Sequence, residues 1–281
     1  MFRIFRILLR GIGQVMFQGN AWSGALMLAG IAVSSVQAAL WALAGNLVGN
    51  LTARACRYSG AAIRDGLYGF NGTLVGIAVG VFFRPGWESI LLLVTGSALS
   101  TWLTRLFLRS RIPGFTAPFI LSTWILLGFS AWTALAAAPT ESQADTTAIP
   151  QWLQAISLHF GQVMFQQDSL LTGVLFLAGI AANSPRAALF ALGGAILPMG
   201  MAFPMQDYAA FNAGLFGYNG VLCAIALAGP SRRDAVWAAA SVVLSTALQW
   251  AGMCLGLITL TAPFVLSTWA VLGVKYIWAK K

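Results

Sequence analysis

Charged residues are scarce in this chain. Only 8% of its 281 residues are charged, whereas a soluble globular domain carries roughly 25%. Hydrophobic residues make up 59%, and the mean hydropathy is +0.80. Such a chain cannot present mainly polar surface to water, so the composition predicts several membrane spans of about 20 residues each.

Histidine and cysteine are scarce as well. His159 is the single histidine, and the three cysteines, Cys56, Cys223 and Cys254, form no C-x-x-C pair. A Cys/His metal site is therefore not expected, and no cofactor is predicted. A membrane enzyme would need a nucleophile–base or metal constellation, which the sequence does not offer. The cysteines are expected to pack in apolar surroundings.

Basic residues give a net charge of +9, but they form no continuous basic face. They stand in short groups between apolar runs, as residues that set membrane topology do. Nucleic acid is therefore not an expected partner. Arg3, Arg6 and Arg10 interrupt the first apolar stretch, and no small-residue cleavage site follows closely. We expect this stretch to belong to the mature protein and not to a signal peptide.

The sequence contains a tandem repeat. QVMFQ occurs at 14–18 and 162–166, and LAGI at 28–31 and 177–180. YGFNG at 68–72 is answered by FGYNG at 216–220, and TAPFILSTW at 116–124 by TAPFVLSTW at 261–269. Four matches in the same order indicate a duplication. The predicted organisation is a first repeat over 1–137, a linker over 138–150 and a second repeat over 151–281.

Each repeat holds one short apolar stretch followed by five longer ones. The short stretches are too short to span and suit re-entrant half-helices, which are tolerated where backbone is buried or lines a cavity. They cover about 4–17 and 151–166. The longer stretches predict helices over about 20–36, 38–54, 66–83, 88–108 and 115–137, and over 169–184, 186–203, 211–229, 235–256 and 260–279. We expect an all-α integral membrane protein.

The positive charges test this topology. If the five long segments of each repeat cross, every basic residue except Arg84 falls on one side with both termini. That distribution predicts cytoplasmic termini. Because five is an odd number, the two repeats must face opposite ways, and solute sites in inverted repeats lie where the repeats meet. The prediction is therefore two inverted repeats of five transmembrane helices forming one pore per protomer.

The repeated positions are neutral and polar, or aromatic. Gln14 and Gln162 carry amides, and Thr116 and Thr261 each precede an Ala-Pro-Phe turn. Acidic residues are expected only near span ends; Asp168, just after the second half-helix, has no predicted partner. Simpler interpretations remain open: the glutamines can brace helix ends, the threonines can be N-caps, and phenylalanines can face lipid. A small, neutral, planar solute suits this lining best.

Taken together, the doubled QVMF, YGFNG and T-x-P-F motifs resemble the urea transporter family over nearly the whole chain. This resemblance implies a homotrimer with one continuous pore per protomer and passive, channel-like flow of urea. It also implies a narrow filter with outer and inner wide sites and a tight middle. As a bacterial member, the protein is expected in the inner (plasma) membrane.

The resemblance also implies roles for matching residues. Gln14 and Gln162 would accept hydrogen bonds from urea, and Thr116 and Thr261 would be the two middle threonines. The slot walls would be Val15, Phe17, Phe70 and Leu74 in one repeat and Val163, Phe165, Tyr218 and Leu222 in the other. Some bacterial members have glutamate at one of the glutamine positions, and phenylalanine is common where Tyr218 stands, so solute preference is the open point.

Two other transport functions are kept as alternatives. An ion- or proton-coupled transporter of another small polar solute would have flux that depends on pH or sodium, and the lack of carboxylates inside the spans counts against it. A channel for ammonium or small amides is the second, but ammonium channels generally use pore histidines, and His159 is unrepeated.

Overall fold

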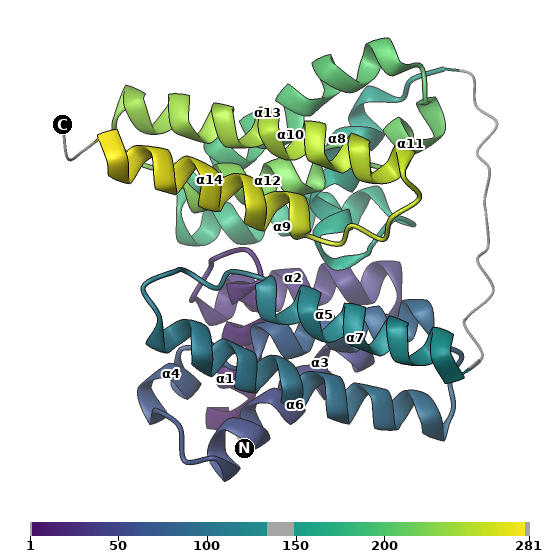
Figure 1. Ribbon diagram of the computed structural model, residues 1–281, viewed down its shortest axis with the longest axis vertical. Helices are drawn as coiled ribbons and strands as arrows, with labels where there is room; N and C mark the ends of the chain where they lie inside the picture. Colours follow the sequence, from purple (N-terminus) through teal and green to yellow (C-terminus); the bar gives the residue numbers. More distant parts are fainter. Residues whose placement is uncertain (1, 134–148, 279–281) are drawn as a thin grey trace. The chain divides into compact units, whose positions relative to one another are not determined.

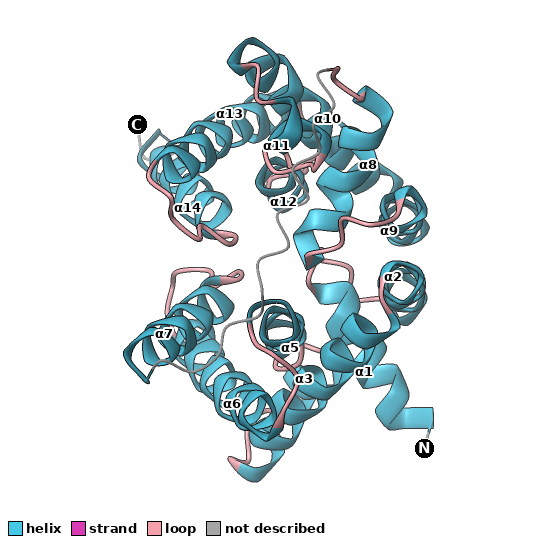
Figure 2. Cartoon of the chain, turned by 90° about the vertical axis from the view of Figure 1, so that its right-hand side faces the viewer, coloured by secondary structure: helices cyan, strands magenta, loops and turns pink. Residues whose placement is uncertain are grey.

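The structure, a computed structural model, describes residues 2–133 and 149–278. The chain divides into two compact units, Met1–Gln143 and Ala144–Lys281. Most of the predicted linker, residues 138–148, lies outside the described residues. Within the described ranges the chain is helical and has no β-strand (Figure 2).

Among the described residues each unit contains seven α-helices in corresponding order, and the second unit has two short 3-10 helices in addition (Figure 1). The first contains α1 Phe2–Gln14, α2 Ala21–Ser34, α3 Val36–Ala55, α4 Gly60–Arg64, α5 Phe70–Phe82, α6 Trp87–Arg109 and α7 Ala117–Thr133. The second contains α8 Trp152–Gly161, η1 Gln162–Met164, α9 Leu170–Asn183, α10 Pro185–Ala202, η2 Phe203–Met205, α11 Tyr208–Asn212, α12 Tyr218–Ala226, α13 Arg232–Cys254 and α14 Ala262–Trp278.

Several of the ten helices predicted to span the membrane are short. By length and composition, three helical segments of the described residues suffice to cross a membrane: Trp87–Arg109, Pro185–Met205 and Arg232–Cys254. Five other apolar helices have 10–17 residues. The 14 residues of α2 and of α9 rise only about 21 Å at 1.5 Å per residue. The predicted spans over 20–36 and 169–184 are thus helical but short.

The predicted helices over 66–83 and 211–229 begin later than expected. Gly66 and Gly214 adopt φ of 80° and 74°, which ends α4 and α11 in a turn before α5 and α12 start. A β-carbon on Gly66 would lie 2.5 Å from the backbone nitrogen of Gly11, and one on Gly214 would lie 2.6 Å from the carbonyl carbon of Leu158. Both positions therefore need glycine for φ and for close packing on the half-helix.

Glycine also sets the packing inside each unit. In the first unit α3, α5 and α6 pack together, and in the second α10, α12 and α13 do the same. A β-carbon on Gly45 would overlap the carbonyl of Gly72, and one on Gly194 would lie 2.5 Å from the carbonyl oxygen of Gly220. Backbones that approach this closely are typical of membrane helices. Small residues there allow the van der Waals contacts that hold the helices together in place of the hydrophobic effect.

One buried polar position is filled differently in the two units. In the first unit Asn46, from α3, packs against Gly69 and donates to the carbonyl of Leu8 at 3.0 Å. In the second unit His159, from α8, packs against Gly217, and its Nδ1 lies 2.8 Å from the carbonyl oxygen of Ala195 on α10. Each contact joins a half-helix to a neighbouring helix. In the first unit the neighbouring helix supplies the side chain, and in the second unit the half-helix does.

Candidate functional site

Each half-helix ends in a tight turn closed by its own motif. Phe17 and Phe165 adopt left-handed backbone conformations, with φ of 62° and 60°. The side-chain amides of the next residues, Gln18 and Gln166, donate to the carbonyls of Met16 and Met164 at 2.7 and 2.6 Å. A left-handed phenylalanine is uncommon and costs free energy. The buried glutamines therefore explain why QVMFQ, and not only QVMF, is repeated.

The site glutamines are oriented by backbone carbonyls. The Nε2 of Gln14 donates to the carbonyl of Asp65 at 3.0 Å, and that of Gln162 to the carbonyl of Ala213 at 2.9 Å. A carbonyl oxygen can only accept, so the amide nitrogen must face it. Each Oε1 atom consequently points away as an acceptor, and both side chains are half-buried.

The surroundings of the two amides differ in charge. Arg10 lies beside Gln14: it pairs with the Asp65 carboxylate at 3.5 Å and donates to the carbonyl of Arg64 at 3.1 Å. In the second unit the amide of Gln162 has a further acceptor instead, the Oε1 of Gln167 at 3.3 Å. The acceptor carbonyl there belongs to Ala213, which carries no charge.

Thr116 and Thr261 lie immediately before α7 and α14, the last helix of each unit. Thr116 and Thr261 are 1% and 3% exposed, and their carbonyls accept the first hydrogen bonds of α7 and α14. The residues before these threonines, Phe115 and Leu260, adopt left-handed backbone conformations, with φ of 46° and 49°. The ring of Phe115 meets the ring of Phe17 edge to face, with centroids 5.9 Å apart. This contact links the half-helix turn to the threonine segment in the first unit.

The remaining residues predicted to form walls lie at the starts of α5 and α12. Phe70 and Tyr218 are the first residues of these helices, and Leu74 and Leu222 follow one turn later, fully buried. The hydroxyl of Tyr218 donates to the carbonyl of Leu260 at 2.6 Å. Because a tyrosine has one hydroxyl hydrogen, this bond leaves no donor for a solute. The hydroxyl that distinguishes Tyr218 from phenylalanine is thus hydrogen-bonded within the protein.

Asn71 and Asn219, from the repeated YGFNG and FGYNG motifs, connect neighbouring helices. Their side-chain oxygens accept from the backbone N–H groups of Phe119 and Phe264, at 3.2 and 3.1 Å. Their amide nitrogens donate to Thr104 at 3.0 Å and to Gln249 at 3.2 Å. The asparagines therefore cap α7 and α14 from neighbouring helices. Their place next to Phe70 and Tyr218 in the repeated motif was the available signal.

In each unit the helix that begins with Phe70 or Tyr218 packs on the half-helix. Val15 and Val163 are 1% exposed, and α5 packs on α1 as α12 packs on α8 and η1. Asp168 is exposed and forms no ion pair among the described residues. No group of three potential metal ligands occurs in the part of the chain that the structure describes. The functional groups available to a solute are amide oxygens, hydroxyls, backbone carbonyls and aromatic rings.

Known proteins resemble this chain over most of its length. The family model described as "Urea transporter" matches residues 5–276. Urea transporter 1 of Rattus norvegicus is 32% identical over 243 residues, and that of Ovis aries is 31% identical over 242. Both matches cover 79% of this chain, which in turn spans 62% of the length of each relative. The chain belongs to the urea transporter family.

Proposed function

We propose that this protein conducts urea passively across the inner membrane, through a neutral, slot-shaped filter. The observation that carries the proposal is the pair of oriented amides. Backbone carbonyls hold the nitrogen ends of Gln14 and Gln162, so each presents an acceptor oxygen of fixed position. Urea has four N–H donors, and removing its water costs several kcal/mol unless acceptors replace it. Two oriented oxygens serve that purpose without charge.

Aromatic and aliphatic side chains supply the walls of the proposed slot. Phe17 and Phe165 follow the glutamines in strained turns, which orders their backbones before a solute arrives. Flat rings accept a planar solute edge-on or by stacking while its edges form hydrogen bonds. Val15, Phe70 and Leu74 would complete one set of walls, and Val163, Tyr218 and Leu222 the other. Thr116 and Thr261 would border the narrow middle.

The proposed architecture is an inverted repeat with both termini cytoplasmic. The repeat is supported by the same order of helices in the two units, the same packing of α1–α7 and α8–α14, and left-handed residues at matching places. The inversion and the cytoplasmic termini are supported by the odd number of predicted spans and by the distribution of the basic residues. The protein would form one pore per protomer in a homotrimer. Labelling of single cysteines placed near each terminus, from one membrane side at a time, tests the topology. Native mass spectrometry of the purified protein tests the trimer.

A coupled transporter and an ammonium channel are the competing functions. Coupling requires an ionisable group or a carbonyl cage within the pathway, and the proposed lining carries no carboxylate. An ammonium channel requires accessible histidine, whereas His159 is 1% exposed and its ring packs on Gly217. Both features favour uncoupled flow of a neutral solute.

The decisive experiment is urea flux into proteoliposomes, measured by stopped-flow light scattering. Purified protein is compared with protein-free liposomes and with the Gln14→Leu/Gln162→Leu variant, with and without proton and sodium gradients. We expect fast urea flux in the native protein, unchanged by either gradient, and much slower flux in the variant. Gradient-dependent flux would indicate coupling, and no urea flux from folded, inserted protein would overturn the urea assignment.

A further inference from the structure

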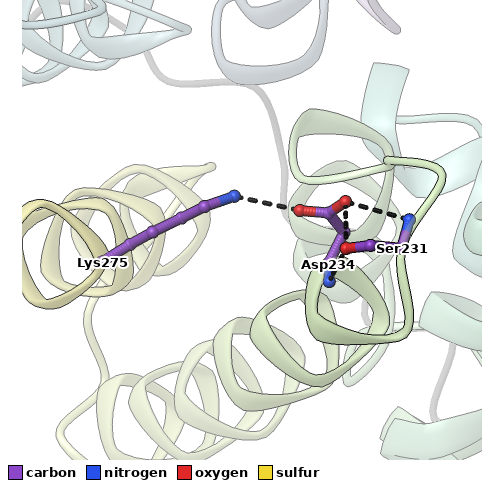
Figure 3. Close-up of polar contacts among 3 residues, drawn as sticks. All are labelled: Ser231, Asp234 and Lys275. Atoms are coloured by element: carbon purple, nitrogen blue, oxygen red, sulfur yellow. Dashed lines mark hydrogen bonds and ion pairs between the residues drawn. The ribbon is translucent and has the colours of Figure 1, made fainter. Parts of the chain in front are cut away.

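The ends of α13 and α14 in the second unit are held together by an ion pair. Lys275, in the last turn of α14, donates to Asp234, in the first turn of α13, at 3.0 Å (Figure 3). The other oxygen of Asp234 accepts from the backbone N–H and the hydroxyl of Ser231, at 3.2 and 2.7 Å. Both oxygens of the carboxylate are therefore engaged, and its single negative charge is paired with Lys275.

Two arginines beside this ion pair have no partner. Arg232 and Arg233 are exposed, and neither forms a hydrogen bond or ion pair with the described residues. Together with Lys275 they give three positive charges against the single charge of Asp234. They line a cavity of 710 Å³ between the two helix ends. This cavity has an excess positive charge that a bound anion would balance.

Aromatic side chains mark the depth of the cavity in a membrane. Trp237 and Trp278 both line it, with ring centroids 5.8 Å apart in an edge-to-face arrangement. Trp278 is 69% exposed. Tryptophan and arginine at the start of a long apolar helix are typical of the interface between headgroups and hydrocarbon. In the proposed topology the cavity would therefore lie at the level of the lipid phosphates.

An exposed apolar stripe runs along α13 from the cavity. Val236 lines the cavity, and Val243 and Trp250 follow at helical spacing, with exposed fractions of 66%, 42% and 45%. The opposite face of α13 is polar and buried, with Ser241 and Ser245 among its residues. The stripe offers a track for an acyl chain that starts at the arginine pair.

The corresponding helix of the first unit lacks this arrangement. α6, which has the place of α13 in the element order, begins with Trp87 and Glu88, where α13 begins with Arg232 and Arg233. An anion would be repelled there. The arginine pair is thus particular to the second unit and is not required to build this kind of helix pair.

We propose that the cavity between the ends of α13 and α14 binds an anionic phospholipid. Arg232 and Arg233 would hold its phosphate, the two tryptophans would flank the glycerol region, and an acyl chain would follow the stripe of α13. Charge complementarity selects an anionic lipid over a zwitterionic one, because the cavity retains two unbalanced positive charges. Arginine suits phosphate in particular, since its guanidinium forms bidentate hydrogen bonds.

The test measures lipid binding to the full-length protein in a neutral detergent. Native mass spectrometry counts bound phosphatidylglycerol and phosphatidylcholine on the native protein and on Arg232→Gln/Arg233→Gln. A matched control, Arg109→Gln/Arg111→Gln, removes two exposed arginines at the end of α6. Inorganic phosphate in large excess serves as a competitor. Urea flux of each variant in phosphatidylcholine liposomes verifies that it is folded.

We expect phosphatidylglycerol to bind the native protein and the control alike, and the Arg232→Gln/Arg233→Gln variant on the order of 30-fold more weakly, as the loss of two basic residues at a membrane surface predicts. Phosphatidylcholine should bind weakly to all three. Equal binding of phosphatidylglycerol to all three proteins would overturn the proposal. So would equal binding of the two lipids, or displacement of the lipid by inorganic phosphate, which would identify a free-anion site.

Discussion

The side-chain oxygen of Asn71 accepts a hydrogen bond of 3.2 Å from the backbone N–H of Phe119 and so caps α7 from another helix. Asn219 does the same for α14, through Phe264 at 3.1 Å. Both asparagines are fully buried. Because an uncapped N–H in a dry interior has no water to replace its partner, these bonds hold the proline-containing segments against the helices that begin at Phe70 and Tyr218.

Replacing Asn71 with leucine should therefore destabilise the protein. The change leaves the N–H of Phe119 without an acceptor, at a cost of about 1–3 kcal/mol. Thermal unfolding in detergent should show a lower Tm. Thr133→Val, which removes an exposed hydroxyl bonded to its own helix, is the control and should leave Tm nearly unchanged. An unaltered Tm in Asn71→Leu would show that the cap contributes nothing.

Replacing Gln14 with leucine should slow urea flux. The variant loses an acceptor that compensates for the removed hydration of urea, and a barrier raised by about 1–3 kcal/mol lowers the rate roughly 5- to 150-fold. Stopped-flow measurements in proteoliposomes give the rate. Gln37→Leu makes the same change at an exposed position of α3 and should conduct like the native protein. Native flux in both variants would exclude Gln14 from the pathway.

Replacing Phe17 with alanine should weaken discrimination among solutes. Its ring packs edge to face on that of Phe115, with centroids 5.9 Å apart, so truncation removes a proposed wall residue and leaves Phe115 less tightly packed. The ratio of N-methylurea flux to urea flux should rise several-fold. Phe129→Ala, on an exposed face of α7, serves as the control for loss of an aromatic ring. If the ratio stays the same in Phe17→Ala, the ring does not form part of the filter.

Replacing Tyr218 with phenylalanine should lower the stability of the protein without slowing urea transport. The hydroxyl donates to the carbonyl of Leu260, so its loss should cost about 0.5–1.5 kcal/mol. Urea flux should change little, because this hydrogen does not reach the solute. Both quantities are measured on one preparation, by thermal unfolding and by stopped-flow. A large fall in flux at unchanged Tm would assign the hydroxyl to solute binding instead.

Replacing Gly45 with alanine should destabilise the first unit. A β-carbon there would overlap the carbonyl of Gly72, and forcing α3 and α5 apart typically costs about 1–3 kcal/mol. Gly128→Ala is the matched control, because open space surrounds that position on α7. The control should be neutral or slightly stabilising, since alanine favours a helix over glycine. Similar Tm values for the two variants would contradict the close-packing explanation.

Local patterns in the sequence were sufficient to predict the helical class and the apolar segments. These features depend on hydropathy, on glycine and on the proline after each threonine, all of which act over a few residues. The doubled motifs also pointed to Gln14, Gln162 and Tyr218. The short helices α4 and α11 and the late starts of α5 and α12 escaped prediction, because they depend on the turns at Gly66 and Gly214 packing on the half-helices.

The sequence by itself therefore determined which residues recur and which chemistry they bring, because duplication and composition are properties of the chain. Only the tertiary structure decided which end of the Gln14 amide faces the carbonyl of Asp65, and that the hydroxyl of Tyr218 is taken by Leu260. It also decided that His159 takes the place against Gly217 that Asn46 takes against Gly69. Each of these outcomes depends on a buried or half-buried polar group finding its partner in another segment, at a separation in sequence that no local pattern encodes.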